Sequence, residues 1–120
     1  MTAMRLLALC AALLLSGCVT RQYEWDNYDS RLFSYYKDPT TANDFRVSLQ
    51  LHLESLEAKN SKPPPGLYAE LGTLYLERGD DKNAIAYYRK ERDSWQESKY
   101  LMESLISTIE KRAKSPEVSR

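Results

Sequence analysis

The chain has a single histidine, His52, and only two cysteines, Cys10 and Cys18, among its 120 residues. Zinc and related metals take three or four His, Cys or carboxylate ligands, so this supply offers almost no metal site. The sequence also lacks a Gly-rich phosphate loop and the Gly-x-Ser-x-Gly turn of many hydrolases. We place His52 on a helix surface and expect no metal, no cofactor and no intrinsic catalysis.

Neither sign of charge is in excess, because 17 Lys and Arg are balanced by 17 Asp and Glu. Nucleic-acid binding needs a clustered excess of basic side chains, so we expect no nucleic-acid partner. The same balance argues against a strongly basic helix lying on a membrane surface. We interpret the acidic residues of the later segments as solvated helix faces with Lys and Arg nearby; these are Glu54, Glu57, Glu91, Asp93 and Glu97.

The longest apolar run is short, with ten residues from Leu6 to Leu15 after the single charge of Arg5. As a helix it would rise only about 15 Å, half of a bilayer core, which predicts a signal peptide rather than a permanent span. The run ends in four residues that resemble the bacterial lipobox, in which small side chains precede a cysteine that receives lipid; these are Leu15, Ser16, Gly17 and Cys18.

We therefore expect residues 1–17 to be removed and Cys18 to carry acyl chains that hold the protein to a membrane. Cys10 would leave with the leader, so the remaining chain could form no internal disulfide. Val19 follows Cys18, where enterobacterial lipoproteins of the inner membrane tend to have aspartate. By that resemblance the address is the periplasmic face of the outer membrane. Residues 18–22 form a short tether, and its last four residues reach about 14 Å.

The rest of the chain predicts an all-α fold of about five short helices in one domain, residues 23–113, with a frayed tail at 114–120. The expected helices are 23–37, 42–59, 67–78, 82–96 and 100–113, and the proline-rich stretch 60–66 is a linker. Residues 45–53 also alternate as a strand would, but the same region carries a helical stripe and no turn residue. We favour a helix there.

Aromatic residues follow one another at helical spacing directly after the tether. Trp25, Tyr28 and Tyr35 form a stripe with Leu32. Such a stripe can pack in the core, anchor at a membrane interface or dock a partner. The spacing favours the core, and the partner reading stays open.

A second pattern covers residues 65–98 and resembles one tetratricopeptide repeat, a helix–turn–helix unit. It consists of Tyr68-x-x-Leu71-Gly72-x-x-Tyr75, then Gly79, then Ala84-x-x-x-Tyr88. Gly72 and Ala84 are small enough for two helices to cross closely, and Gly79 can end the first helix without a Cβ penalty. Tyr75 and Tyr88 are expected to fill the space between the helices. The chain departs from the repeat at Glu91, where a small residue is usual, and at Gln96, where proline is usual.

The repeat geometry also implies a groove that could hold an extended peptide. Its lining would be Ala69, Thr73, Leu76 and Glu77. A lone repeat leaves its faces uncovered, so the flanking helices or a partner must cover them.

Almost the whole chain after Cys18 resembles a family of small outer-membrane lipoproteins, the domain of unknown function 4810. The resemblance rests on Tyr23-x-Trp25-x-x-Tyr28, Leu32-x-x-Tyr35-Tyr36-Lys37-x-Pro39, Pro64-Pro65-Gly66-Leu67 and Leu71-Gly72-x-Leu74-Tyr75, and continues through Gly79, Ala84, Lys90-Glu91 and Met102. Glu24 and Asp26-Asn27 stand where the family pattern has Tyr and Gly-Asp. The family has no known activity, and its genes often lie beside genes for a curli-secretion-like outer-membrane lipoprotein and a second small lipoprotein.

The resemblance and the missing catalytic set together favour an adaptor or assembly subunit of an envelope complex, with other envelope lipoproteins as partners. The alternative is a peptide-binding tetratricopeptide-like module. An envelope enzyme is a second alternative, and it lacks any visible catalytic set.

Overall fold

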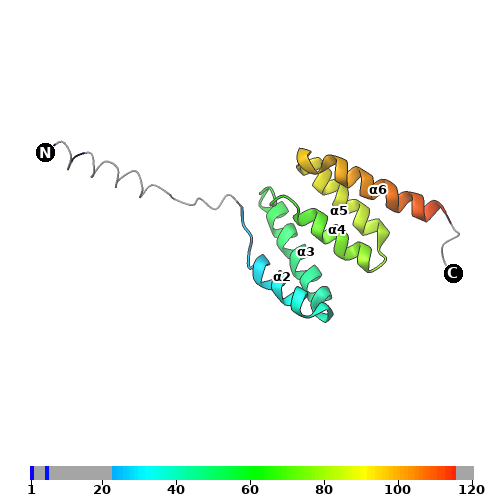
Figure 1. The fold of residues 1–120 in the computed structure, drawn as a ribbon, viewed down its shortest axis with the longest axis horizontal. Helices are drawn as coiled ribbons and strands as arrows, with labels where there is room; N and C mark the ends of the chain where they lie inside the picture. The colour runs from blue at the N-terminus through cyan, green and yellow to red at the C-terminus, as the bar shows by residue number, and fades with distance from the viewer. Residues whose placement is uncertain (2–4, 6–22, 116–120) are drawn as a thin grey trace.

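The computed structural model describes residues 1, 5 and 23–115 of the chain (Figure 1). The predicted signal peptide apart from residues 1 and 5, the lipobox, Cys18, the whole tether and residues 116–120 of the tail lie outside these residues. In the described part there are five α-helices, two short 3₁₀ turns and no strand, so the all-α prediction is confirmed. The elements are α2 (Tyr28–Lys37), η1 (Pro39–Thr41), α3 (Ala42–Ala58), α4 (Leu67–Glu77), α5 (Asp81–Ser94), η2 (Gln96–Ser98) and α6 (Lys99–Lys114).

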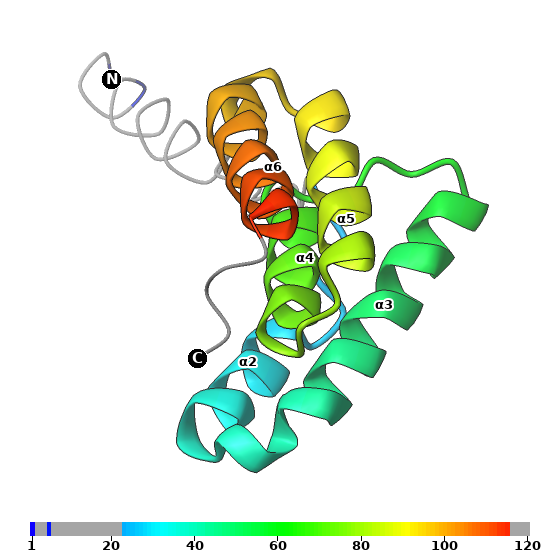
Figure 2. The same ribbon diagram turned by 90° about the vertical axis from the view of Figure 1, so that its right-hand side faces the viewer.

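Consecutive helices pack against each other in chain order, α2 on α3, α3 on α4, α4 on α5 and α5 on α6 (Figures 1 and 2). The α4–α5 pair makes the most extensive of these contacts. Among the described helices, α2 and α6 are the first and last of the series, so each has only one neighbour in the series.

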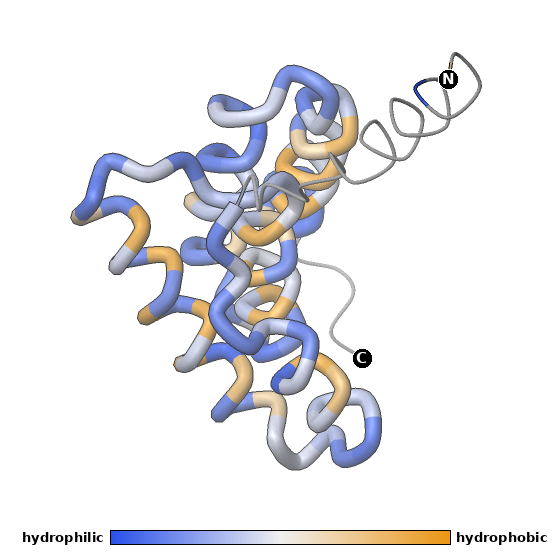
Figure 3. The backbone as a smooth tube through the Cα atoms, turned by 90° about the vertical axis from the view of Figure 1, so that its left-hand side faces the viewer, coloured by the Kyte–Doolittle hydropathy of each residue, from blue (hydrophilic) through white to orange (hydrophobic). Residues whose placement is uncertain are grey.

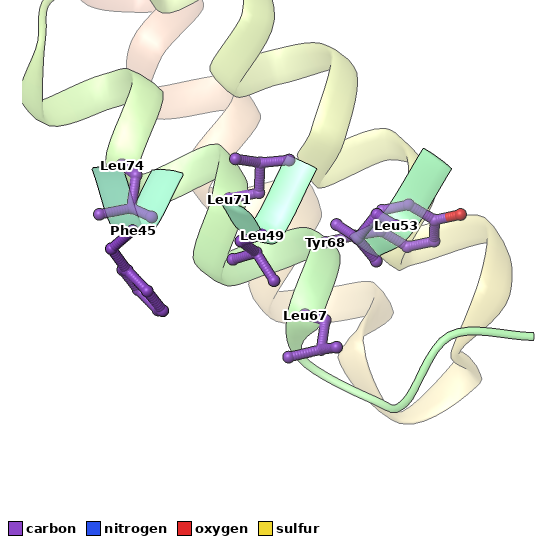
Figure 4. Packing of buried hydrophobic residues seen from close by; sticks show 7 residues of the cluster. All are labelled: Phe45, Leu49, Leu53, Leu67, Tyr68, Leu71 and Leu74. Atoms are coloured by element: carbon purple, nitrogen blue, oxygen red, sulfur yellow. The ribbon is translucent and has the colours of Figure 1, made fainter. Parts of the chain in front are cut away.

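The first core cluster joins α3 to α4, and its side chains interdigitate between the two helices (Figure 4). Its buried members are Phe45, Leu49, Leu53, Leu67, Tyr68, Leu71 and Leu74. The α3 members repeat at steps of four, as does the buried face of a helix. The prediction of a helix at 45–53 is therefore confirmed, and the strand-like alternation does not form a strand.

The second core cluster joins α6 to the α4–α5 hairpin. Its buried members are Ala84, Tyr88, Met102, Ile106 and Ile109. Gly72 of α4 lies at the closest approach: a Cβ there would lie 2.8 Å from Tyr88 Cδ1 and Cε1 and 3.1 Å from the Ala84 carbonyl oxygen. Only a residue without a side chain fits this crossing unless its neighbours move.

The hairpin turn uses the left-handed conformation that glycine adopts without strain. Gly79 has φ 78°, its N–H donates to the Leu76 carbonyl, and the next N–H, of Asp80, donates to the Tyr75 carbonyl. Asp80 then caps α5 by accepting the Asn83 N–H at 3.1 Å.

The first helix begins later than predicted. It begins at Tyr28 rather than Tyr23, because Asp26 and Asn27 have φ values of 34° and 57° and cannot continue a right-handed helix. Trp25 therefore precedes the helix, although its ring still packs at 5.6 Å from that of Tyr28. The other four helices begin and end within two residues of their predicted limits.

Glu91 was predicted on a solvated face, and this is wrong: its side chain is fully buried. Its Oε1 accepts the Gly66 N–H at 2.8 Å and the Ser98 hydroxyl at 3.0 Å. Ala84, Tyr88 and Glu91 share one face of α5, so the carboxylate points into the hairpin. It fixes both the proline-rich linker and the α5–α6 turn to the same end of α5.

Candidate functional site

A hollow of about 500 Å³ opens on the surface between α3 and the segment that precedes and begins α2. Two further hollows of about 480 and 430 Å³ extend it toward Tyr23 and Lys59 at one end and toward Ser34 and Thr41 at the other. We call this continuous depression the α3 trough. The central hollow is lined by Asp26, Arg31, Asp44, Val47, Ser48, Leu51, His52 and Ser55.

The trough exists because α3 carries apolar residues on two faces. Phe45, Leu49 and Leu53 are buried in the core, whereas Val47 and Leu51 are 40% and 61% exposed. Hydrophobic and hydrophilic positions accordingly alternate along α3 (Figure 3). Ser48 and Ser55 line the same hollow, and their small side chains leave the space that forms it. Within the described residues, the buried Ser48 hydroxyl has no hydrogen-bond partner.

His52 fixes the wall of the trough. It was predicted on a helix surface, and this is wrong, since the residue is only 9% exposed. Its Nε2 lies 2.9 Å from the Glu24 carbonyl oxygen, an acceptor only, so Nε2 carries the proton and donates. Its Nδ1 lies 3.8 Å from Asp26 Oδ2, and Arg31 lies 4.0 Å from the same oxygen. His52 thus holds residues 24–26 against α3.

The floor of the trough is aromatic. Trp25, Tyr28 and Phe45 lie beneath it, next to His52. Burial, with a smaller contribution from the charge of Glu70, raises the pKa of Tyr28 to about 12. The hydroxyl therefore stays protonated near neutral pH, and the floor adds no charge to the trough.

The stripe of Trp25, Tyr28 and Tyr35 packs mainly inward. All three side chains are half-buried against the first core cluster. The Tyr35 ring stacks on Phe45 with centroids 5.5 Å apart, and its hydroxyl donates to Glu77 Oε2 at 3.4 Å. Of the three, Trp25 lines the hollow toward Lys59, and Tyr28 lies in the floor of the trough.

The four residues expected to line a repeat groove do not form one open surface. Ala69 and Leu76 are half-buried against the second core cluster, which includes α6. Thr73 is exposed, and its Oγ1 lies 3.0 Å from the Tyr88 hydroxyl. Glu77 is exposed and accepts the hydroxyl of Tyr35 on α2. Ala69 and Leu76 thus face the second core cluster, Thr73 contacts α5 and Glu77 contacts α2, so the four side chains do not share one surface.

The residues expected to shape the hairpin lie in two places. Gly72, Ala84 and Tyr88 are buried where α4 and α5 cross, whereas Leu71 is buried in the first core cluster, between α3 and α4. Tyr75 turns instead toward α3: its hydroxyl donates to Gln50 at 2.6 Å and accepts from Arg46 at 3.0 Å, while its ring stacks on Tyr87.

Two features are absent from the part of the chain that the structure describes. In residues 23–115, no helix is long and apolar enough to cross a membrane. The same part of the chain contains no group of three His, Cys, Asp or Glu side chains placed to hold a metal ion.

Sequence reasoning missed Val47, Leu51, Asp26 and Arg31 as residues of a surface depression. The signal was present in the alternation of residues 45–53, because a helix with that pattern must expose the apolar residues that its core stripe does not use.

Comparison with known proteins gives one match. No curated protein and no solved structure matches the chain. The family model described as "Domain of unknown function (DUF4810)" matches residues 22–105 and so spans α2 to the first half of α6. This is well over half of the chain, which therefore belongs to the DUF4810 family.

Proposed function

We propose that the chain is the precursor of an outer-membrane lipoprotein, anchored through Cys18, that acts by contact as an adaptor or assembly subunit of an envelope complex. The proposal of an anchor is supported by the ten-residue apolar run that ends in Leu15-Ser16-Gly17-Cys18. The partner would be another envelope lipoprotein, of the curli-secretion-like kind that the family resemblance implies.

The α3 trough is the structural feature that best supports a docking surface. Val47 and Leu51 expose apolar area in its central hollow, which the charged Asp26, Arg31 and Asp44 also line. Protein interfaces commonly combine apolar area with polar groups in this way.

The anchor makes a modest docking surface sufficient. A tether of a few residues confines the domain to a thin layer at the membrane, where other lipoproteins are also confined. Confinement raises the effective concentration of each partner for the other, so a weak contact can be well occupied.

The tetratricopeptide-like peptide groove has weaker support. The α4–α5 hairpin does cross closely at Gly72, as such a repeat requires. However, Ala69 and Leu76 are largely used in packing against the α6 side of the fold. We therefore assign the docking role to α3 rather than to α4.

Photo-crosslinking in intact cells tests the docking surface. A photoreactive residue in place of Leu51 should give a defined crosslink to one envelope protein, because this exposed side chain lines the trough. The matched control is Ser104, an exposed residue on α6, where the same photoreactive group should give none. Adding Val47→Glu should sharply reduce the crosslink from position 51.

The docking proposal fails if position 51 gives no crosslink. It also fails if positions 51 and 104 give the same products, since contact would then not depend on the trough.

A further inference from the structure

We propose that one end of the domain rests on the phospholipid surface, through a patch of aromatic, apolar and lysine side chains beside the point where the tether joins the fold. We call this patch the tether end. It comprises Tyr23, Lys59, Lys62, Trp95, Lys99, Tyr100 and Leu101. The inference depends on the proposed lipid at Cys18 and goes beyond it, because an anchor alone does not fix how the domain is oriented.

The position of Tyr23 places the tether end close to the proposed lipid anchor. Only residues 19–22 separate it from Cys18, a reach of about 14 Å when fully extended. The Tyr23 ring packs edge-on against Trp95, with centroids 5.9 Å apart. The tether thus enters the fold beside the turn between α5 and α6, and the bilayer surface must lie close to that turn.

The side chains around this turn have the chemistry of a bilayer interface. The Lys62 ammonium lies 3.5 Å from the centre of the Trp95 ring. Directly after the turn, Tyr100 is 84% exposed and Leu101 is 60% exposed, so neither serves the core. Trp and Tyr concentrate at the level of lipid headgroups, and lysine places its aliphatic stem along apolar surface with the charge in water.

The fold holds these parts together at one end. The buried Glu91 carboxylate binds Gly66 of the linker and Ser98 of η2, so the linker and the start of α6 cannot separate. In both Figure 1 and Figure 2, the linker between α3 and α4 and the α5–α6 turn lie in the upper part of the domain, opposite the turn between α2 and α3.

Charge is a secondary part of this surface. Lys59, Lys62 and Lys99 stand against the nearby Glu24 and Glu97, and Lys59 already pairs with Glu24 at 3.5 Å. The lipid anchor supplies the attraction, and the aromatic and apolar side chains set the orientation. Since α3 runs from the lower to the upper end of the domain (Figure 1), this orientation directs the trough sideways, toward other proteins at the membrane.

A fluorescence-quenching experiment on the lipidated protein tests the orientation. After signal-peptide removal and acylation of Cys18, the chain has no free thiol, so one introduced cysteine is labelled uniquely. The test variant is Tyr100→Cys, and the matched control is Tyr36→Cys, which replaces a 75% exposed tyrosine near the opposite end. Both proteins are labelled with bimane and reconstituted into phosphatidylcholine vesicles that contain a shallow nitroxide-labelled phospholipid.

We expect quenching at position 100 to be several-fold greater than at position 36, and Leu101→Cys to behave like Tyr100→Cys. Vesicle flotation, run in parallel, shows whether the protein is anchored. Floating protein with equal quenching at positions 36 and 100, or with stronger quenching at 36, overturns the orientation and leaves the anchor standing. Protein that carries no lipid and does not float overturns both.

Discussion

Replacing Gly72 with leucine should destabilise the protein severely, because there is no room for a side chain where α4 crosses α5. Even a Cβ would lie 2.8 Å from two ring atoms of Tyr88 and 3.1 Å from a backbone oxygen of α5. Overpacking of this kind costs about 1–3 kcal/mol, and leucine adds three more carbon atoms to a site that lacks space for one. In a domain of this size each kcal/mol lowers the Tm by about 4–8 °C.

Thermal unfolding followed by circular dichroism measures the effect. Ala86→Leu is the matched control, since it also enlarges a small helix residue but at an exposed position of α5, and it should leave the Tm nearly unchanged. In a Tyr88→Ala background the Gly72→Leu penalty should shrink, because the ring that the new side chain meets is gone. An unchanged Tm for Gly72→Leu would contradict the close crossing.

Replacing Glu91 with alanine should give the second large loss of stability. The substitution removes the acceptor for two donors and leaves the Gly66 N–H without its partner. A typical intramolecular hydrogen bond contributes about 0.5–1.5 kcal/mol, and two are lost. Glu91→Gln should cost much less, since its amide oxygen can accept both hydrogen bonds, and Oε2, the atom it replaces, has no partner among the described residues.

Urea unfolding gives the stability difference, and hydrogen exchange locates it. The Gly66 amide should exchange faster in Glu91→Ala and stay protected in Glu91→Gln. Glu97→Ala, which removes an exposed carboxylate from η2, should change stability by no more than about 0.5 kcal/mol. Equal stability and equal Gly66 protection in the Ala and Gln variants would show that the carboxylate does not hold the linker.

Helical spacing was sufficient to predict the fold class. The stripe of Phe45, Leu49 and Leu53 favoured a helix over a strand for α3, because a helix buries residues at steps of three and four whatever lies between them. The start of α2 was not predictable from the same spacing. Trp25 is in phase with the stripe, yet the left-handed conformation of Asp26 and Asn27 places it before the helix.

The wrong predictions for His52 and Glu91 share one cause. Both residues were expected at the surface because their side chains are polar, although their spacing along the helix places them on a buried face. His52 lies three residues after Leu49 and is next to Leu53, and Glu91 lies three residues after Tyr88. Each therefore occupies a buried face, and each found backbone or hydroxyl partners there. The alternation of residues 45–53 could indicate that Val47 and Leu51 are exposed, but local pattern could not predict the trough itself, because its wall is a segment 28 residues away in sequence that folds back onto α3.

The anchor at Cys18 is the claim on which membrane location, partner and orientation all depend, and intact-mass analysis of the protein purified from cell envelopes tests it most directly. We predict a chain that begins at Cys18 and carries the mass of a diacylglycerol with any further acyl group, together with an uncut, unlipidated precursor for Cys18→Ala. A wild-type chain that retains residues 1–17, or that begins at another residue without added lipid mass, would contradict it.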